Sequence, residues 1–339
     1  MLVPMITNVD ASVRRTLSPS DSLVNVQIIA QFEPRRRVSA LSRTLSRPQA
    51  MVDSERKAAH MEAPISFFLP SSAGDLFAMY YPPAETAVGG GDILYVHPFA
   101  AEMFASRNVI AAVARDLSAK GLGVLTVDLY GCGDSSGDFR DARWEIWRDD
   151  LAAAVGWLQA QGRDRLSLWG LRLGALLAME FAVRSRETYE RIVLWQPAVT
   201  GHNLLTQFFR MNLDEADTRF FTRPLTDSEA RKSLPDGQNI EVAGWEIPSE
   251  LIRAIDKVKI APLGNAVSAP IHWMEIGEQT ENPFHRQSLR VIEEWKQHGI
   301  RVTTHKSAGL PFWLFPHSID PMSLMSDLKS MFSDQQGHD

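Results

Sequence analysis

Residues 166–180 read LSLWGLRLGALLAME, and this stretch decides the fold. A short apolar run passes into an Ala- and Leu-rich segment with almost no loop between them. Gly170 and Gly174 stand two residues either side of Arg172. A strand that turns sharply into a helix crowds the residue at its tip, and only glycine avoids clashes at the flanking positions. The stretch therefore predicts a strand, a tight turn with Arg172 at its tip, and a helix.

The turn has the spacing of G-x-S-x-G, the nucleophile elbow of α/β-hydrolases, with arginine at the position of the nucleophile. A guanidinium stays protonated at any working pH, so Arg172 cannot attack a carbonyl. The sequence therefore carries the most recognisable motif of this fold at residues 170–174 without its usual nucleophile.

Composition limits the classes of function. The 339 residues are 45% hydrophobic, which is enough for one sizeable core and a modest insertion. A net charge of −6 argues against a general nucleic-acid surface. The single cysteine, Cys132, excludes an internal disulfide and a cysteine-based zinc cluster. No apolar run approaches the roughly 20 residues of a membrane span. Walker, G-x-G-x-x-G and metal-ligand spacings are absent, so no cofactor and no metal are expected.

The N-terminal segment differs from the rest of the chain. Residues 1–60 carry a net charge of +4 and the remainder carries −10. The segment is rich in Ser and Arg and has no sustained period of 2 or 3.6, so residues 1–63 are predicted to be disordered. A second interpretation is that translation begins at Met51 or Met61. Folded sequence is expected from about Pro64.

Strands and helices alternate from there on. An opening hairpin is expected at 65–69 and 76–81, then uniformly apolar strands separated by helices, which predicts a mostly parallel, doubly wound sheet covered on both faces. Expected strands are 93–96, 124–127, 166–171, 192–195, 271–276 and 300–305, and expected helices are 106–119, 143–161, 283–298 and 320–332. Residues 199–265 break the rhythm and are expected to form a helical cap. The predicted core is 64–198 with 266–332, and 333–339 is a disordered tail.

The parts of a hydrolase site are expected in a fixed order along the chain. His97-Pro98-Phe99 ends a strand where the oxyanion loop belongs. Backbone N–H groups of Phe99 or Ala100, with that of Leu173, are candidates for binding an oxyanion. The alternative is a loop that only shares the shape of an oxyanion loop.

The acid and the histidine of a triad have weaker candidates. Glu278 and Glu281 follow the strand where the acid belongs, and the alternative is an ordinary surface loop. Residues 309–313, GLPFW, occupy the place of the histidine loop but contain no histidine. His305 and His317 are the nearest substitutes as general bases, although a lone histidine near a strand end is more often structural.

The loop after the strand 124–127 offers other nucleophiles. Cys132 lies between two glycines just past the end of that strand, the functional edge of such sheets, and a thiol is readily activated. The alternative is a small residue in a tight turn. Ser135 and Ser136 are weaker candidates. Asp134 and Ser135 join His97, Phe99 and Leu173 as candidate substrate-binding residues.

Four segments together carry a resemblance to a known family: VHPFA at 96–100, DLYGCGDSSGDF at 128–139, WGLRLGAL at 169–176 and GLPFW at 309–313. They are similar to the second type of exosortase-A-system-associated hydrolase, an α/β-hydrolase-like family of Gram-negative bacteria. The resemblance covers about residues 64–332. It implies a cytoplasmic protein of a locus for exopolysaccharide production and PEP-CTERM sorting, and it does not imply a substrate.

Three functional hypotheses follow. The first is an esterase-like enzyme acting on an acyl ester or thioester, with Arg172, Cys132, Glu278 and His317 as the candidate catalytic set. The second is a non-catalytic hydrolase-like protein in which Arg172 holds an anionic ligand. The third is structural, with Arg172 buried and paired to Asp134, Glu102 or Glu278, because an unpaired buried guanidinium is too costly. A small acyl or anionic molecule is the expected partner, with no nucleic acid and no membrane span.

Overall fold

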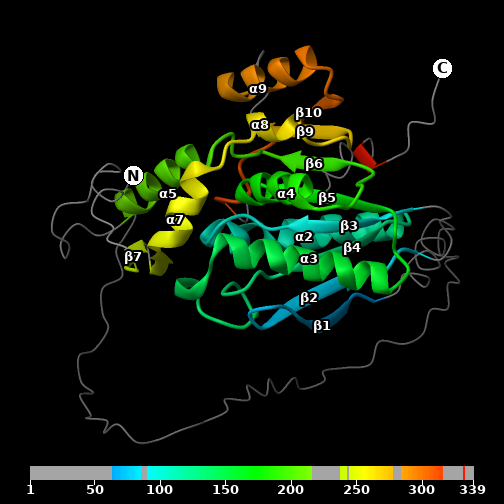
Figure 1. Ribbon diagram of the computed structural model, residues 1–339, viewed down its shortest axis with the longest axis horizontal. Helices are drawn as coiled ribbons and strands as arrows, with labels where there is room; N and C mark the ends of the chain where they lie inside the picture. The colour runs from blue at the N-terminus through cyan, green and yellow to red at the C-terminus, as the bar shows by residue number, and fades with distance from the viewer. Residues whose placement is uncertain are drawn as a thin grey trace, which may run out of the picture. The chain divides into compact units, whose positions relative to one another are not determined.

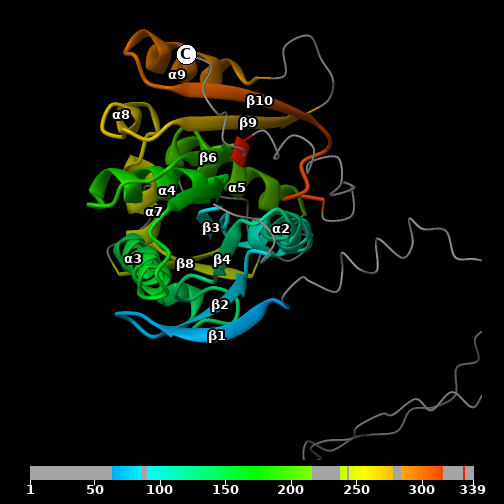
Figure 2. The same cartoon turned by 90° about the vertical axis from the view of Figure 1, so that its right-hand side faces the viewer.

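The computed structural model describes residues 63–84, 90–215, 237–242, 244–277, 284–315 and 331–332. The predicted disordered segment 1–63, the tail 333–339, most of the last predicted helix and the candidates Glu278, Glu281 and His317 lie almost wholly outside these residues. Figures 1 and 2 show the described chain as a sheet with helices on both faces.

Eight strands form the main sheet in the order β1-β2-β4-β3-β5-β6-β9-β10. β2 pairs antiparallel with β1 and β4, and all the other neighbours pair parallel. The strands are β1 (Ile65–Pro70), β2 (Asp75–Tyr81), β3 (Asp92–Val96), β4 (Gly123–Val127), β5 (Leu166–Leu171), β6 (Ile192–Trp195), β9 (Ile271–Gly277) and β10 (Val302–Ala308). The predicted mostly parallel sheet with an opening hairpin is confirmed.

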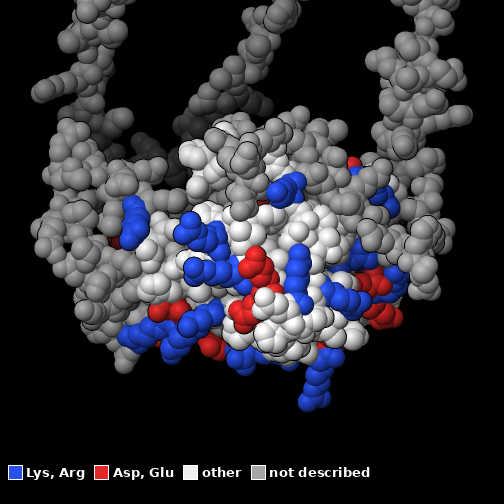
Figure 3. All heavy atoms as spheres, turned by 90° about the horizontal axis from the view of Figure 1, so that it is seen from above, with Lys and Arg blue, Asp and Glu red and all other residues white. Residues whose placement is uncertain are grey.

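Helices cover the two faces unequally (Figure 2). One face carries α3 (Trp144–Ala160), α4 (Leu173–Arg184), α8 (Ala261–Gly264) and α9 (Arg286–Gln297), and the other carries α2 (Ala101–Ala119). β3, β5 and β6 are buried along their whole length, because helices lie on both sides of them. Seen from the α9 side, Lys and Arg side chains are intermixed with Asp and Glu (Figure 3).

The segment after β6 contains the predicted helices and a hairpin that was not predicted. Its elements are α5 (Gly201–Glu215), β7 (Asn239–Val242), β8 (Trp245–Pro248), α7 (Ser249–Lys257) and α8. β7 and β8 pair antiparallel. Trp245 packs edge-on against Phe139, which follows β4, with ring centroids 4.9 Å apart. This contact joins the segment after β6 to the loop that follows β4.

Several boundaries differ from expectation, including the start of α9, which is Arg286 and not residue 283. The helix predicted to begin at residue 106 begins at Ala101, because the chain turns directly out of the β3 loop at Ala100, whose φ is 48°. The last strand begins two residues later than predicted and runs to Ala308. Among the described residues no helix is long and apolar enough to cross a membrane.

Candidate functional site

The elbow has the backbone that its sequence predicts. Arg172 is the N-cap of α4 with φ 56° and ψ −113°, a conformation that non-glycine residues rarely adopt. A Cβ on Gly174 would lie 2.1 Å from the carbonyl oxygen of Val96, and one on Gly170 would lie 2.4 Å from Cα of Ala175. Neither contact is tolerable, so glycine is required at both positions. The turn of β5 into α4 is therefore fixed by close packing against β3 and α4.

The side chain of Arg172 is engaged by protein groups. Its Nε donates to Oε1 of Glu102 at 3.2 Å, and its Nη2 donates to Oε1 of Gln207 at 3.0 Å. Its Cζ lies 5.7 Å from the ring centroid of Trp313, within cation–π range. The side chain is only 13% exposed. Of the three predicted partners, the structure pairs Arg172 with Glu102.

Glu102 belongs to the first turn of α2 and is buried slightly more deeply than its partner, with 11% of its side chain exposed. Burial raises the pKa of Glu102, and the charge of Arg172 together with its hydrogen bond opposes that rise. A cation at the N-terminus of α4 is unfavourable for the helix dipole, and the neighbouring carboxylate offsets it. The ion pair connects the N-terminal ends of α2 and α4, which lie on opposite faces of the sheet.

Aromatic side chains fill the predicted place of the histidine. Phe312 and Trp313 are buried, and Phe312 packs edge-on against Trp195 at the end of β6, with centroids 6.2 Å apart. His305 lies on β10, three strands from β5 and hence roughly 14 Å away across the sheet. It is hydrogen-bonded to His272 on β9 at 2.9 Å. The described residues therefore bring no histidine to the elbow from this end of the chain.

The loop predicted to be an oxyanion loop leads directly from β3 into α2. Ala100 has φ 48° and ψ −124°, close to the values of Arg172, and begins α2 as Arg172 begins α4. His97 is buried, with Nδ1 donating to the carbonyl of Pro98 at 2.7 Å and Nε2 accepting from the backbone N–H of Leu129 at 3.2 Å. Burial lowers the pKa of His97, so the ring is neutral and ties the end of β3 to the end of β4.

The remaining candidates near the β3 loop are packing groups. Phe99 is buried between Phe139 and Phe208, at centroid distances of 5.6 Å and 5.0 Å. Leu173, the first residue of α4, has a buried side chain, and its backbone N–H belongs to the first turn, whose donors have no acceptor within the helix. The N–H groups of Ala100 and Leu173, which were predicted to bind an oxyanion, thus lie at the N-termini of α2 and α4.

The loop after β4 is held by internal bonds. Ser135 donates to the carbonyl of Asp128 at 2.5 Å and accepts from the N–H of Phe77 at 2.8 Å, so its hydroxyl links the loop to β2. Asp134 is exposed and lies 3.6 Å from Arg107, not beside Arg172. Burial, then the charges of Asp128 and Asp150, raise the pKa of the Cys132 thiol well above its usual value. Ser136 accepts from the N–H of Asp75 at 3.1 Å.

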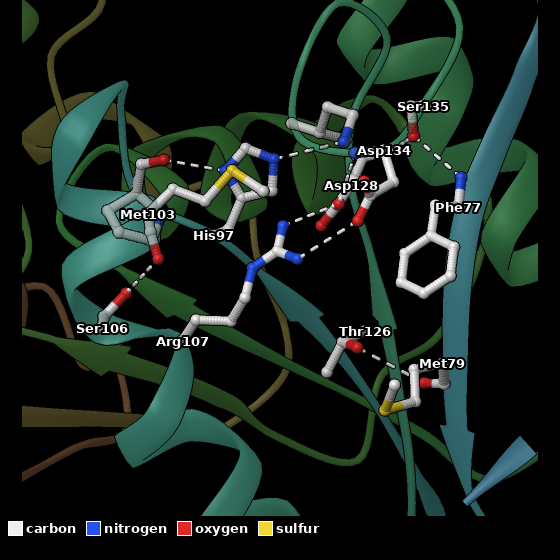
Figure 4. Close-up of polar contacts among 12 residues, drawn as sticks. Phe77, Met79, His97, Met103, Ser106, Arg107, Thr126, Asp128, Asp134 and Ser135 are labelled. Carbon is white, nitrogen blue, oxygen red and sulfur yellow. Dashed lines mark hydrogen bonds and ion pairs between the residues drawn. The ribbon is translucent and has the colours of Figure 1, made fainter. Parts of the chain in front are cut away.

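A cavity of about 230 Å³ lies beside this region and not at the elbow. It is bounded by α2 on one side and by β2, β3 and β4 on the other, with Arg107 and Asp128 facing each other at its edge (Figure 4). No sequence motif pointed to it, because its residues are spread over three strands and a helix. Among the described residues no group of three or more His, Cys, Asp or Glu side chains could hold a metal ion.

Comparison with known proteins gives the same fold. Residues 103–238 match the family model described as serine aminopeptidase, S33. Est1E from Butyrivibrio proteoclasticus superimposes with a TM-score of 0.55 at 15% identity, over 78% of this chain and 96% of that one. An esterase of Pyrococcus furiosus gives 0.52 at 15%, over 88% and 96%. A proline iminopeptidase of Mycobacterium smegmatis gives 0.52 at 15%, over 79% and 97%. No curated protein matches the chain.

Proposed function

This chain has the α/β-hydrolase fold, and from that premise we propose that it binds a small acyl-bearing or anionic molecule without hydrolysing esters at its elbow. One observation carries the proposal: the tip of the elbow is Arg172, whose guanidinium is occupied by Glu102, Gln207 and Trp313. A permanently protonated side chain offers no nucleophile. The hypothesis that Arg172 itself holds the anionic ligand is less well supported, since Glu102 supplies the anion.

The resemblance described above supplies the expected setting. It suggests a cytoplasmic protein that serves exopolysaccharide production and PEP-CTERM sorting. Acylated intermediates of polysaccharide assembly are a class of molecule that such a binding protein would handle. We keep this setting as part of the proposal.

Ester or thioester hydrolysis is the second candidate. It is favoured by the retained positive φ at Ala100 and Arg172, since backbone strain of this kind is commonly kept at functional sites. It also agrees with the serine aminopeptidase model that matches residues 103–238. Against it, Cys132 is a buried, protonated thiol and the Ser135 hydroxyl is used twice for packing.

Turnover of p-nitrophenyl butyrate and labelling by a fluorophosphonate test the proposal. We expect neither in the wild type, and none in Arg172→Ser, because Trp313 stands where a histidine would have to activate the new hydroxyl. A serine esterase assayed in parallel is the positive control. Turnover with kcat/KM above about 10⁴ M⁻¹s⁻¹ would contradict the proposal. Its loss in Ser135→Ala or Cys132→Ser would then identify the nucleophile.

A further inference from the structure

The cavity beside α2 owes its existence to the alternation of β2. Leu76, Ala78 and Tyr80 point into the core, whereas Phe77, Met79 and Tyr81 point to the other face of the sheet and line the cavity. On that face α2 lies over β3 and β4, and its side chains form the second wall. We call this space the α2 cavity.

Apolar surface continues out of the α2 cavity. Phe68 on β1 is 60% exposed and lies directly across from Phe77 in the strand register. The two rings pack edge-on at a centroid distance of 5.9 Å. An apolar strip therefore runs from Met79 through Phe77 to Phe68. A ligand that filled the cavity would have further apolar surface along which to extend.

Two arginines of α2 line the cavity and are engaged differently. Arg107 donates to Oδ2 of Asp128 at 2.7 Å and lies 3.6 Å from Asp134, so its charge is balanced. Arg115 is exposed and lies 5.9 Å from the ring of Tyr81, and the described residues offer it no ion pair. Because Arg107 is balanced by Asp128 and Asp134, Arg115 is the lining cation that the described residues leave to a ligand.

The Tyr81 phenol on the lining is a hydrogen-bond donor at neutral pH. Burial raises the pKa of the Tyr81 phenol, and the charges of Arg115 and Arg107 oppose this only in part. Tyr81 therefore stays protonated beside Arg115. A guanidinium and a phenol next to an apolar wall form a site for one negatively charged oxygen group attached to an apolar body.

We propose that the α2 cavity binds a monoanionic carboxylate with an aliphatic or aromatic body, held at its carboxylate by Arg115 and along its body by Phe77 and Met79. The size agrees, because a 150 Å³ apolar cavity holds one benzene ring and this one measures about 230 Å³. A single excess positive charge favours a carboxylate over a dianionic phosphate. The inference deepens the proposed binding role by giving it a site and a ligand class.

Octanoate is the probe, titrated into the full-length chain by calorimetry, with octylamine and octyl phosphate at the same chain length for comparison. We expect octanoate to bind with a Kd below about 1 mM, octyl phosphate more weakly, and octylamine not at all. Arg115→Gln should weaken octanoate at least tenfold. Ala111→Leu should do the same by filling the space, since Ala111 lines the cavity. Arg290→Gln, an equal change of charge on an exposed residue of α9, should leave the Kd unchanged.

Several results would overturn the inference: no binding of octanoate to the wild type, binding that neither Arg115→Gln nor Ala111→Leu weakens, or tighter binding of octylamine or octyl phosphate. Equal weakening by Arg290→Gln would mean that only net charge matters. The p-nitrophenyl butyrate assay measures ester hydrolysis at the elbow independently of octanoate binding in the α2 cavity. Esterase activity with octanoate binding intact would overturn the proposed lack of hydrolysis alone, and absent binding without esterase activity would overturn this inference alone.

Discussion

The elbow and the α2 cavity both place arginine beside the sheet, and they use it differently. Arg172 is 13% exposed, bonded to Glu102 and Gln207, and stacked on Trp313. Arg115 is exposed at an open cavity and has no acidic partner among the described residues. α2 serves both regions, because it carries Glu102 at its start and Arg115 near its end. The guanidinium of Arg172 at the elbow is paired with protein groups, whereas the guanidinium of Arg115 at the cavity is available to a ligand.

This difference shows that the backbone conformation of an elbow does not determine which side chain stands at its tip. Ala100 and Arg172 share nearly the same φ and ψ, although one carries a methyl group and the other a guanidinium. The backbone is dictated by glycines and by the packing of helix on strand. The side chain at the tip is then free to serve as a nucleophile or, as here, as half of an ion pair.

The largest effect is expected from the glycine that permits this packing. Gly174→Ala should destabilise the chain by more than about 3 kcal/mol, because the new Cβ would lie 2.1 Å and 2.5 Å from the backbone oxygens of Val96 and His97. Gly156→Ala in α3 is the matched control, since nothing lies within 4 Å of its Cβ. It should stabilise by roughly 0.5–1 kcal/mol through helix propensity. Urea unfolding measures both, and the same sign for both variants would refute the account of the elbow.

The backbone of the elbow is the part of the candidate site that the sequence predicted in most detail. Glycine spacing in residues 170–174 predicted strand, turn and helix, because steric exclusion is local. The order of apolar strands gave the parallel sheet for a similar reason. The partner of Arg172 could only be narrowed to three carboxylates, since Glu102 is 70 residues away and only the fold brings it close.

The hairpin β7–β8 and the α2 cavity were not predicted. The strands of the hairpin, NIEV and WEIP, do alternate polar and apolar residues, but each is only four residues long and lies in a mostly polar segment, so the alternation is too short to predict a strand. The cavity depends on which face of β2 is left uncovered by helices. The hairpin is a local pairing with a weak signal, whereas the cavity has no local signal because it arises from the packing of segments far apart in the chain.

A second buried carboxylate, Asp150, has no ion pair among the described residues, and its pKa is raised. Asp150 is fully buried and accepts from Ser71 Oγ at 2.6 Å and from the N–H of Tyr130 at 2.8 Å, and burial raises its pKa to about 6. The folded state therefore holds a proton between about pH 4 and pH 6 that the unfolded state has lost. This contribution to stability is present at low pH and is lost as pH rises through 6.

Asp150→Asn should remove the loss of stability that occurs as pH rises through 6. The amide cannot ionise, keeps the hydrogen bond from the N–H of Tyr130 and can donate to Ser71. We expect the variant to be more stable than wild type by roughly 2 kcal/mol at pH 7.5 and by nearly nothing at pH 4. Glu145→Gln, at an exposed residue of the same helix, is the control and should show no such pH dependence. Urea midpoints across pH 4–8 would settle the matter, and parallel curves for wild type and Asp150→Asn would contradict the assigned pKa.

Replacing Arg115 should change the free energy of unfolding much less than replacing Arg172. Arg115→Gln should change the free energy of unfolding by less than about 0.5 kcal/mol, since the exposed side chain has no ion pair to lose in the described structure. Thermal unfolding without ligand measures this. A loss of several kcal/mol would mean that Arg115 is structural, as Arg172 is, and that the contrast between the two regions is mistaken.

The thiol of Cys132 should react slowly with alkylating reagents in the native chain. Its thiol is 4% exposed and its pKa is raised, so iodoacetamide should alkylate it at least about a hundredfold more slowly than free cysteine at pH 7.5. The same reaction in denaturant is the control and should proceed at the ordinary rate. Fast labelling of the native chain would reopen Cys132 as a nucleophile.

The central claim, that Arg172 is bound by Glu102 and not by a ligand, is tested most directly by a double-mutant cycle. Arg172→Met keeps a Cβ at the strained backbone and removes the charge, and Glu102→Leu removes its partner. Each single variant should lose roughly 3–5 kcal/mol, because the other charge is left buried. The double variant should lose far less than the sum, with a coupling above about 1.5 kcal/mol. The exposed pair Arg165 and Glu190 is the control, with an expected coupling below about 1 kcal/mol. A cycle at Arg172 and Glu102 with coupling near zero, together with a stabilised Arg172→Met, would contradict the account.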